Sequence, residues 1–116
     1  MAVKRLLTEF GMGSSLRRQD YTEAAVRAVK EALWHNSINL AELFGREKGE
    51  MQILVEVGVQ APDQVAVARV AEIFPYGAVE VAVRKGGLDV PRGDGGKPTV
   101  IANVAISVAL DLEGAV

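Results

Sequence analysis

The chain has 116 residues, a formal net charge of −2 and a hydrophobic content of 49%, so we expect a single domain, 1–116, with its own core. Charges of both signs are scattered along it, which argues against nucleic acid or an anionic membrane as a partner. With no cysteine and a single histidine, the chain lacks the usual ligands of a metal site, and we expect neither a metal nor a cofactor. No apolar segment is long enough to span a bilayer and no signal peptide is visible, so the expected location is the cytoplasm.

The first predicted element is a strand over 3–10. Its alternation divides the side chains between two faces, with Leu6, Thr8 and Phe10 on one and Leu7 and Glu9 on the other. Gly11 and Gly13 then interrupt the pattern, and a loop is predicted over 11–19. Two glycines this close indicate either positive φ angles or a close approach of two backbones.

A helix is predicted from Asp20 to within 34–37. Asp20 is a favourable N-cap residue, and Glu23 follows three residues later, as in a capping box. Glu23, Arg27 and Glu31 are spaced four apart on the polar side of this helix, where they can form ion pairs.

The remaining predicted segments are a helical turn over 40–44, a strand over 51–59, a helix over 62–73, a strand over 78–84, a glycine-rich loop over 86–98 and a strand over 99–112. The order β-α-β-α-β-β predicts an α+β fold, with a four-stranded mixed sheet, both helices on one face, and the last two strands paired as a hairpin. We expect the loop to be mobile, with Arg92 and Lys97 able to close over an acidic ligand.

This element order resembles the fold of the Bacillus-type chorismate mutases and of the reactive-intermediate deaminases, which assemble as trimers. The second face of the sheet points to assembly as well. By alternation it carries Glu9, Gln52, Leu54, Glu56, Gly58, Ala82, Arg84, Ile101, Asn103, Ala105, Ser107 and Ala109. Because this mixture is too apolar for a solvated surface and too polar for a dry core, we expect a homotrimer or larger homo-oligomer. The alternative is a solvated face with incidental alanines.

Gly11 and Gly13 resemble the start of a Gly-x-Gly-x-Asp-x-His-Gly motif near the N-terminus of an uncharacterised bacterial family of conserved hypothetical proteins. Ser15, Arg17 and Arg18 stand where that family has Asp, His and the last Gly. The resemblance therefore implies no metal or acid–base role for these positions in this chain.

A second, more distant resemblance concerns Thr8 and Glu9, which match part of a Lys-Thr-Glu-Gly stretch in the domains of ring-opening amidohydrolases. Leu7 occupies the position of the catalytic lysine. This departure puts a Ser-Lys mechanism in doubt.

The stretch 9–20 holds the strongest candidate site. Its backbone N–H groups, serine hydroxyls and arginines can hold an anion or a carboxylate beside the start of the helix. The candidate ligand-binding residues are Gly11, Gly13, Ser14, Ser15, Arg17, Arg18, His35 and Asn103. The alternative is a glycine turn with solvated arginines, and Asp20 opposes an anion at that helix end.

Two members of this set lie outside the stretch. His35 stands at a helix end, where it is either a general base or a partner of the helix dipole. Asn103 lies within a strand, where it either binds a ligand or satisfies a neighbour across an interface.

We expect the protein to bind a small, anionic metabolite in a cleft between the subunits of a homo-oligomer, without catalysis. The alternative is a small-metabolite enzyme, of the hydrolase or lyase/isomerase type, that uses the loop 11–20. No catalytic residue can be assigned from the sequence.

Overall fold

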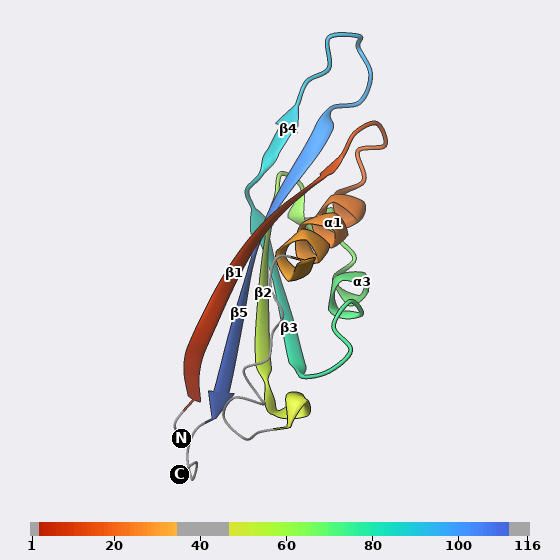
Figure 1. Cartoon of the computed structure of the whole chain (residues 1–116). Helices are drawn as coiled ribbons and strands as arrows, with labels where there is room; N and C mark the ends of the chain where they lie inside the picture. The colour runs from red at the N-terminus through yellow and green to blue at the C-terminus, as the bar shows by residue number, and fades with distance from the viewer. Residues whose placement is uncertain (1–2, 35–46, 112–116) are drawn as a thin grey trace.

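The computed structural model describes residues 3–34 and 47–111, which form an open β-sheet with two helices on one face (Figure 1). The elements are β1 (Val3–Ser15), α1 (Tyr21–Trp34), η1 (Lys48–Glu50), β2 (Gln52–Val59), η2 (Pro62–Gln64), α3 (Val67–Ala71), β3 (Ala78–Lys85), β4 (Leu88–Val90) and β5 (Thr99–Asp111). The α+β class is confirmed, and the predicted elements that fall in the described residues occur in the predicted order. The turn predicted over 40–44 lies outside those residues.

The sheet has five strands rather than the four predicted. Its order is β1-β5-β2-β3, and β4 also pairs with β5. β5 is antiparallel to β1, β2 and β4, whereas β2 and β3 are parallel. The hairpin partner of β5 is therefore β4, and the predicted hairpin between the strand over 78–84 and the last strand is wrong.

β4 begins where the chain crosses the end of β2 at Gly86 and Gly87. Gly87 has a φ of 60°, and a Cβ there would lie 2.1 Å from the carbonyl oxygen of Ile101. The Gly86 amide donates to the Val59 carbonyl at 2.9 Å, and Gln60 Nε2 donates to the Gly86 carbonyl at 3.0 Å. Glycine permits this crossing because it has no side chain to collide with the neighbouring strand. Part of the segment predicted as a loop over 86–98 is therefore a strand.

The core lies between the sheet and α1, as the alternation predicts. The buried apolar side chains of the two central strands are Ile53, Val55, Val57 and Val59 from β2 and Val100, Ala102, Val104, Ile106, Val108 and Leu110 from β5. From α1 the buried set includes Ala24, Ala25, Ala28, Val29 and Ala32. Alanines on this side of the helix allow it to approach the sheet closely.

β1 continues through Gly11 and Gly13 to Ser15, so the loop predicted over 11–19 starts too early. Neither glycine has a positive φ. A Cβ at Gly11 would lie 2.2 Å from the Ala28 carbonyl oxygen, and one at Gly13 would lie 2.3 Å from the Ala28 nitrogen. Of the two reasons predicted for this glycine pair, close backbone approach is therefore the correct one.

From Leu7 onward, the faces of β1 are the reverse of those predicted. Arg5 pairs with Ala109 and Leu7 with Val108, so Leu6 is one extra residue that forms a β-bulge. As a result Thr8 and Phe10 lie in register with Ser107 and Ala105, on the face away from the helices, while Glu9 lies in register with the buried Ile106. Glu9 is thus a correction to the predicted second face.

The second helix is also shorter than the predicted helix over 62–73. Residues 62–64 form a 3₁₀ turn, Val65 is extended at φ −87° and ψ 125°, and only Val67–Ala71 is α-helical. The Ala66 amide donates to Thr22 Oγ1 at 2.9 Å, which joins the start of α3 to α1.

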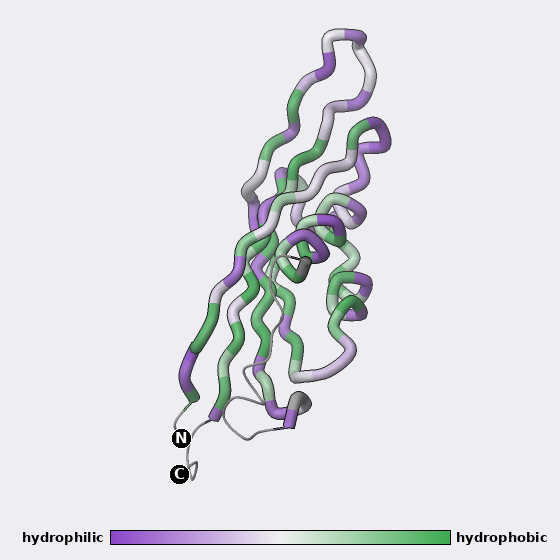
Figure 2. The backbone as a smooth tube through the Cα atoms, viewed as in Figure 1, coloured by the Kyte–Doolittle hydropathy of each residue, from purple (hydrophilic) through white to green (hydrophobic). Residues whose placement is uncertain are grey.

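The face away from the helices, which we call the open face, has no covering element among the described residues. Its members come from the strands in register: Thr8, Phe10, Met12, Ser14, Gln52, Leu54, Glu56, Gly58, Ala78, Glu80, Ala82, Arg84, Leu88, Val90, Ile101, Asn103, Ala105, Ser107, Ala109 and Arg5. Figure 2 shows hydrophobic residues along the whole length of the strands, including the ends that project past the helices. The radius of gyration is 15.9 Å, compared with about 13 Å for a compact domain of this length.

Candidate functional site

A pocket of about 370 Å³ lies where β1 ends and α1 begins. Its lining residues are Ser15, Leu16, Arg17, Arg18, Asp20, Glu23 and Arg27, and we call it the arginine pocket. Three positive and two negative side chains line it, so the pocket has a formal charge of 3 − 2 = +1. The structure thus brings Ser15, Arg17 and Arg18 together, as the sequence predicted, and adds Arg27.

The turn that shapes this pocket is held by two hydrogen bonds. The Asp20 amide donates to Ser15 Oγ at 3.1 Å, and the Glu23 amide donates to Asp20 Oδ1 at 2.9 Å. Asp20 is therefore the N-cap, as predicted. The other half of the predicted capping box is absent among the described contacts of Asp20, because its own amide is bound by the buried Ser15.

Arg27 is fixed from two sides. Its Nη1 donates to the Ser14 carbonyl at 2.7 Å, and its Nε lies 3.1 Å from Glu23 Oε1. The predicted Glu23–Arg27 ion pair is confirmed. Glu31, the third residue of that series, accepts a hydrogen bond from the Met12 amide at 2.9 Å. The contacts of Arg27 with Ser14 and Glu23 hold its guanidinium beside the last residues of β1.

Arg17 and Arg18 are exposed, and within residues 3–34 and 47–111 neither takes part in a salt bridge. Leu16 beside them is 60% exposed. Two exposed guanidinium groups and an apolar side chain around one pocket can donate charged hydrogen bonds to an anion and contact an apolar part of the same ligand.

The other predicted site residues lie elsewhere. Gly11 and Gly13 lie under α1, and Ser14 contributes its carbonyl to Arg27. Asn103 is exposed on the open face, beside a second hollow of about 280 Å³ that Phe10 also lines. His35 lies outside the described residues. The predicted ligand-binding set is therefore split between two faces of the sheet.

A partly buried polar contact that the sequence did not reveal joins α1 to β4. The Tyr21 hydroxyl donates to Asp89 Oδ2 at 2.5 Å, and Gln19 Nε2 donates to the Tyr21 oxygen at 3.2 Å. Burial raises the pKa of Tyr21, and the hydrogen bond to Asp89 raises it further. In the sequence Tyr21 looks like the first apolar residue of the helix, and nothing in the sequence indicates Asp89 as its partner.

The segment predicted to close over an acidic ligand contains a local turn. Arg92 forms an ion pair with Asp94, and the Gly96 amide donates to Asp94 Oδ1 at 2.9 Å. The hydrogen bond from Gly96, and beyond it the charge of Arg92, lower the pKa of Asp94. Arg92 is thus already engaged by a carboxylate, and closure of this segment remains a prediction.

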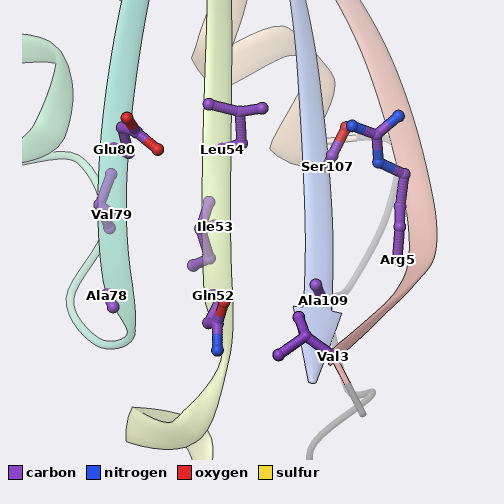
Figure 3. Close-up of a pocket in the computed structure, with 10 residues that line it drawn as sticks. All are labelled: Val3, Arg5, Gln52, Ile53, Leu54, Ala78, Val79, Glu80, Ser107 and Ala109. Atoms are coloured by element: carbon purple, nitrogen blue, oxygen red, sulfur yellow. The ribbon is translucent and has the colours of Figure 1, made fainter. Parts of the chain in front are cut away.

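A larger groove of about 670 Å³ lies on the open face, at the end where β5 finishes. Figure 3 shows its ten lining residues, with Arg5 on β1 extending toward Ser107 on β5, and Glu80 on β3 projecting toward Leu54 on β2. Its floor is formed in part by Ser107, Ala109 and Ala78, whose side chains are small. A charged residue thus stands at each edge of the groove, with opposite signs.

Two further features bear on function. Within residues 3–34 and 47–111, no group of three or more His, Asp or Glu side chains is placed to hold a metal ion. In the same part of the chain no helix combines the length and apolarity that crossing a membrane requires.

Comparison with known proteins places this geometry in a family. A crystal structure at 1.22 Å of an FtsZ-like protein of unknown function from Nostoc punctiforme is similar, with a TM-score of 0.87 and 35% sequence identity over 96% of this chain and 98% of that one. No protein with a curated functional description matches. The family model described as conserved hypothetical protein (Lin0512_fam) matches residues 5–108, a range that includes Gly11, Gly13 and the whole arginine pocket. The chain therefore belongs to this family of conserved hypothetical proteins.

Proposed function

We propose that this protein is a self-associating, non-catalytic binder of a small anionic ligand, and that the ligand occupies the arginine pocket. The observation that carries the proposal is the convergence of Arg17, Arg18 and Arg27 on one pocket of about 370 Å³. That volume lies within the range of about 300–1,000 Å³ that is typical of small-molecule sites.

The three arginines have different parts in this proposal. Arg27 is held by Ser14 and Glu23, so its guanidinium provides a positive charge that is already fixed in place at one side of the pocket. Arg17 and Arg18 follow the end of β1 in an exposed turn and supply the direct contacts to the anion. A carboxylate or a phosphate suits them, because guanidinium binds both through paired N–H groups.

Self-association is supported by the open face. The exposed large hydrophobic side chains of the described residues include Phe10 at 73%, Met12 at 55%, Leu88 at 59% and Val90 at 39%, all of which belong to that face. Large apolar side chains exposed on one face of a sheet are a feature of protein–protein contact sites. The arginine pocket is formed by α1 and the end of β1, so assembly through the open face leaves it accessible, and the pocket need not lie between subunits.

Ligand binding is tested by isothermal calorimetry with inorganic phosphate, pyrophosphate and a series of mono- and dicarboxylates as probes. A charged hydrogen bond contributes roughly 1.5–3 kcal/mol, so Arg17→Ala or Arg18→Ala should weaken binding of the best probe by about one to two orders of magnitude. The matched control is Arg69→Ala, an exposed arginine on α3 that does not line the pocket. It should bind the probe as the parent does.

Two results would contradict the proposal. If both pocket variants bind as tightly as the parent and the control, the turn is only a connector. If a bound probe is converted to product at a rate that depends on Arg17 or Arg18, the alternative of a small-metabolite enzyme replaces non-catalytic binding.

A further inference from the structure

We propose that the open face is a homodimer interface, in which two copies pack face to face about a two-fold axis that runs along the strands between β5 and β2. This inference rests on the self-association part of the proposed function and is independent of the anion. It gives the interface a defined pairing of residues, which the register of the sheet allows us to derive.

The open face is organised in rows across the strands, and the size of its side chains alternates within two of these rows. One row reads Phe10, Ala105, Glu56 and Ala82 from β1 through β5 and β2 to β3. The sequence along this row is large, small, large, small.

The row nearest the end of β5 repeats this alternation. It reads Arg5, Ala109, Gln52 and Ala78 in the same strand order. Here too a large side chain stands on β1 and β2, and a small one on β5 and β3. This is the floor of the groove in Figure 3, where Ala109 and Ala78 leave space beside the larger residues.

A two-fold axis along the strands, placed between β5 and β2, sets β1 of one copy opposite β3 of the second copy and β5 opposite β2. Phe10 then fits over Ala82 of the second copy, and Gln52 fits over Ala109. Each large side chain in these two rows meets a small one, in both directions, as an isologous contact requires. Facing sheets pack about 10 Å apart with their strands nearly aligned, which is compatible with this axis.

Two charged residues of the face, Arg5 and Glu80, match under the same operation, while Glu56 and Arg84 already form an ion pair within one copy at 2.9 Å. Arg5 on β1 and Glu80 on β3 are separated by β5 and β2, roughly 14 Å at the usual strand spacing, so they cannot pair within one copy. Their rows are adjacent, because Glu80 lies level with Leu54 and Ser107. The two-fold axis places Arg5 of each copy beside Glu80 of the other.

The apolar arm formed by β4 and β5 extends the contact. Leu88 pairs with Ile101 on neighbouring strands, so the axis places Leu88 of one copy against Ile101 of the second. Four rows across four strands give a flat area on the order of 500 Å². Side-chain relief and this arm bring the face close to the ~800 Å² per partner of a stable interface.

A different axis would not give this fit. A two-fold axis across the strands, centred on the same rows, sets β1 of one copy opposite β1 of the second copy and β5 opposite β5. It sets the small residues Ala105 and Ser107 against each other and brings Leu54 onto the Glu56 carboxylate. That arrangement leaves voids along β5, which are unfavourable, and it keeps Arg5 on β1 away from Glu80 on β3.

The first test is sedimentation velocity of the full chain at micromolar concentration. The parent should be a dimer, Phe10→Asp should be a monomer, and the control Val67→Asp, an exposed apolar residue on α3, should remain a dimer. Arg5→Glu and Glu80→Arg should each raise the dimer dissociation constant at least about tenfold, and the double variant should recover most of the loss. Recovery identifies a contact between copies, because these residues are too far apart within one copy.

The second test is chemical cross-linking, which the absence of native cysteine makes unambiguous. A short bismaleimide should link two copies of the double variant Phe10→Cys/Ala82→Cys and leave Phe10→Cys alone unlinked. Cross-linking of the single variant, a trimer in sedimentation, or an unchanged dimer for Phe10→Asp would each overturn the proposed axis. A monomeric parent would overturn self-association as well, whereas calorimetry on the arginine variants tests the anion site separately.

Discussion

Replacing Gly13 by alanine probes the closest contact between α1 and the sheet. The added Cβ would lie 2.3 Å from the Ala28 nitrogen and 2.4 Å from the Ala24 carbonyl oxygen. Both atoms belong to the helix backbone, so no side-chain rotation can relieve the contact. Restoring an ordinary separation of about 3.5 Å requires α1 to move by roughly 1 Å. Because such overpacking typically costs about 1–3 kcal/mol, we expect a decrease in the free energy of unfolding at the upper end of that range.

The assay is urea unfolding at one fixed protein concentration, because self-association also shifts apparent stability. Gly93→Ala is the matched control: it has no positive φ, and a Cβ there would have no neighbour within 4 Å. The control should change the free energy of unfolding by about 0.5 kcal/mol or less. Because α1 carries Arg27 of the arginine pocket, Gly13→Ala should weaken anion binding too. Equal stability of the two alanine variants would refute the close-approach explanation of the glycine pair.

Three further changes have defined outcomes. Because the pKa of Tyr21 is raised in the folded state, its protonated hydroxyl stabilises the fold below the unfolded-state pKa of 10.0, and this contribution is lost as the pH rises through the folded-state pKa. Thermal melting from pH 8 to 11 should therefore show a steeper fall in melting temperature for the parent than for Tyr21→Phe. Asp20→Ala removes the N-cap and should lower the free energy of unfolding by about 0.5–2 kcal/mol, while Asp20→Asn should retain most of it in the same denaturation experiment. Asp94→Ala should accelerate hydrogen exchange at the Gly96 amide, because that amide donates a hydrogen bond to the Asp94 carboxylate. A shift in the global melting temperature in place of this local effect would contradict the turn.

The elements predicted well are those in which one face is buried, because burial of that face determines the alternation of apolar residues in the sequence. β2 and β5 each bury every second residue on the helix side of the sheet, and β5 buries Ser107 in addition. The start of α1 was predictable because Asp20 caps it through a contact only three residues away. A local pattern is enough to predict an element when the side that packs against the rest of the protein is the side on which the sequence places its apolar residues.

The elements predicted poorly depend on contacts between distant residues. In the local sequence, Gly11 and Gly13 indicate the end of the first strand. They instead continue β1, because the backbone of α1 packs so closely there that no side chain fits. β4 has only three residues and exists because the chain crosses β2 at Gly86 and Gly87 to reach β5. The spacing of small residues was the available signal, since glycines two apart on a strand match alanines four apart on a helix.

The candidate site divides in the same way. Ser15, Arg17 and Arg18 are close in sequence, so a common pocket could be predicted. Arg27 enters from the second turn of α1, and its place depends on the distance between helix and strand. Asn103 was included in the candidate set because of its unusual position in a strand, and it lies on the face that the alternation predicted, away from the arginine pocket.

The β-bulge at Leu6 connects the packing of α1 to the proposed interface. Without the extra residue, Glu9 would face outward, Phe10 would face α1, and the glycines would not lie under the helix. With it, Gly11 and Gly13 take the helix side, where only glycine fits, and the large side chains of Phe10 and Met12 must take the open face. Because a shift of one residue exchanges the two faces of a strand, the close approach of α1 and the exposed apolar residues of the open face follow from the same register. The exposure of Phe10 is therefore a consequence of this register, and it is the feature that the proposed dimer interface would cover.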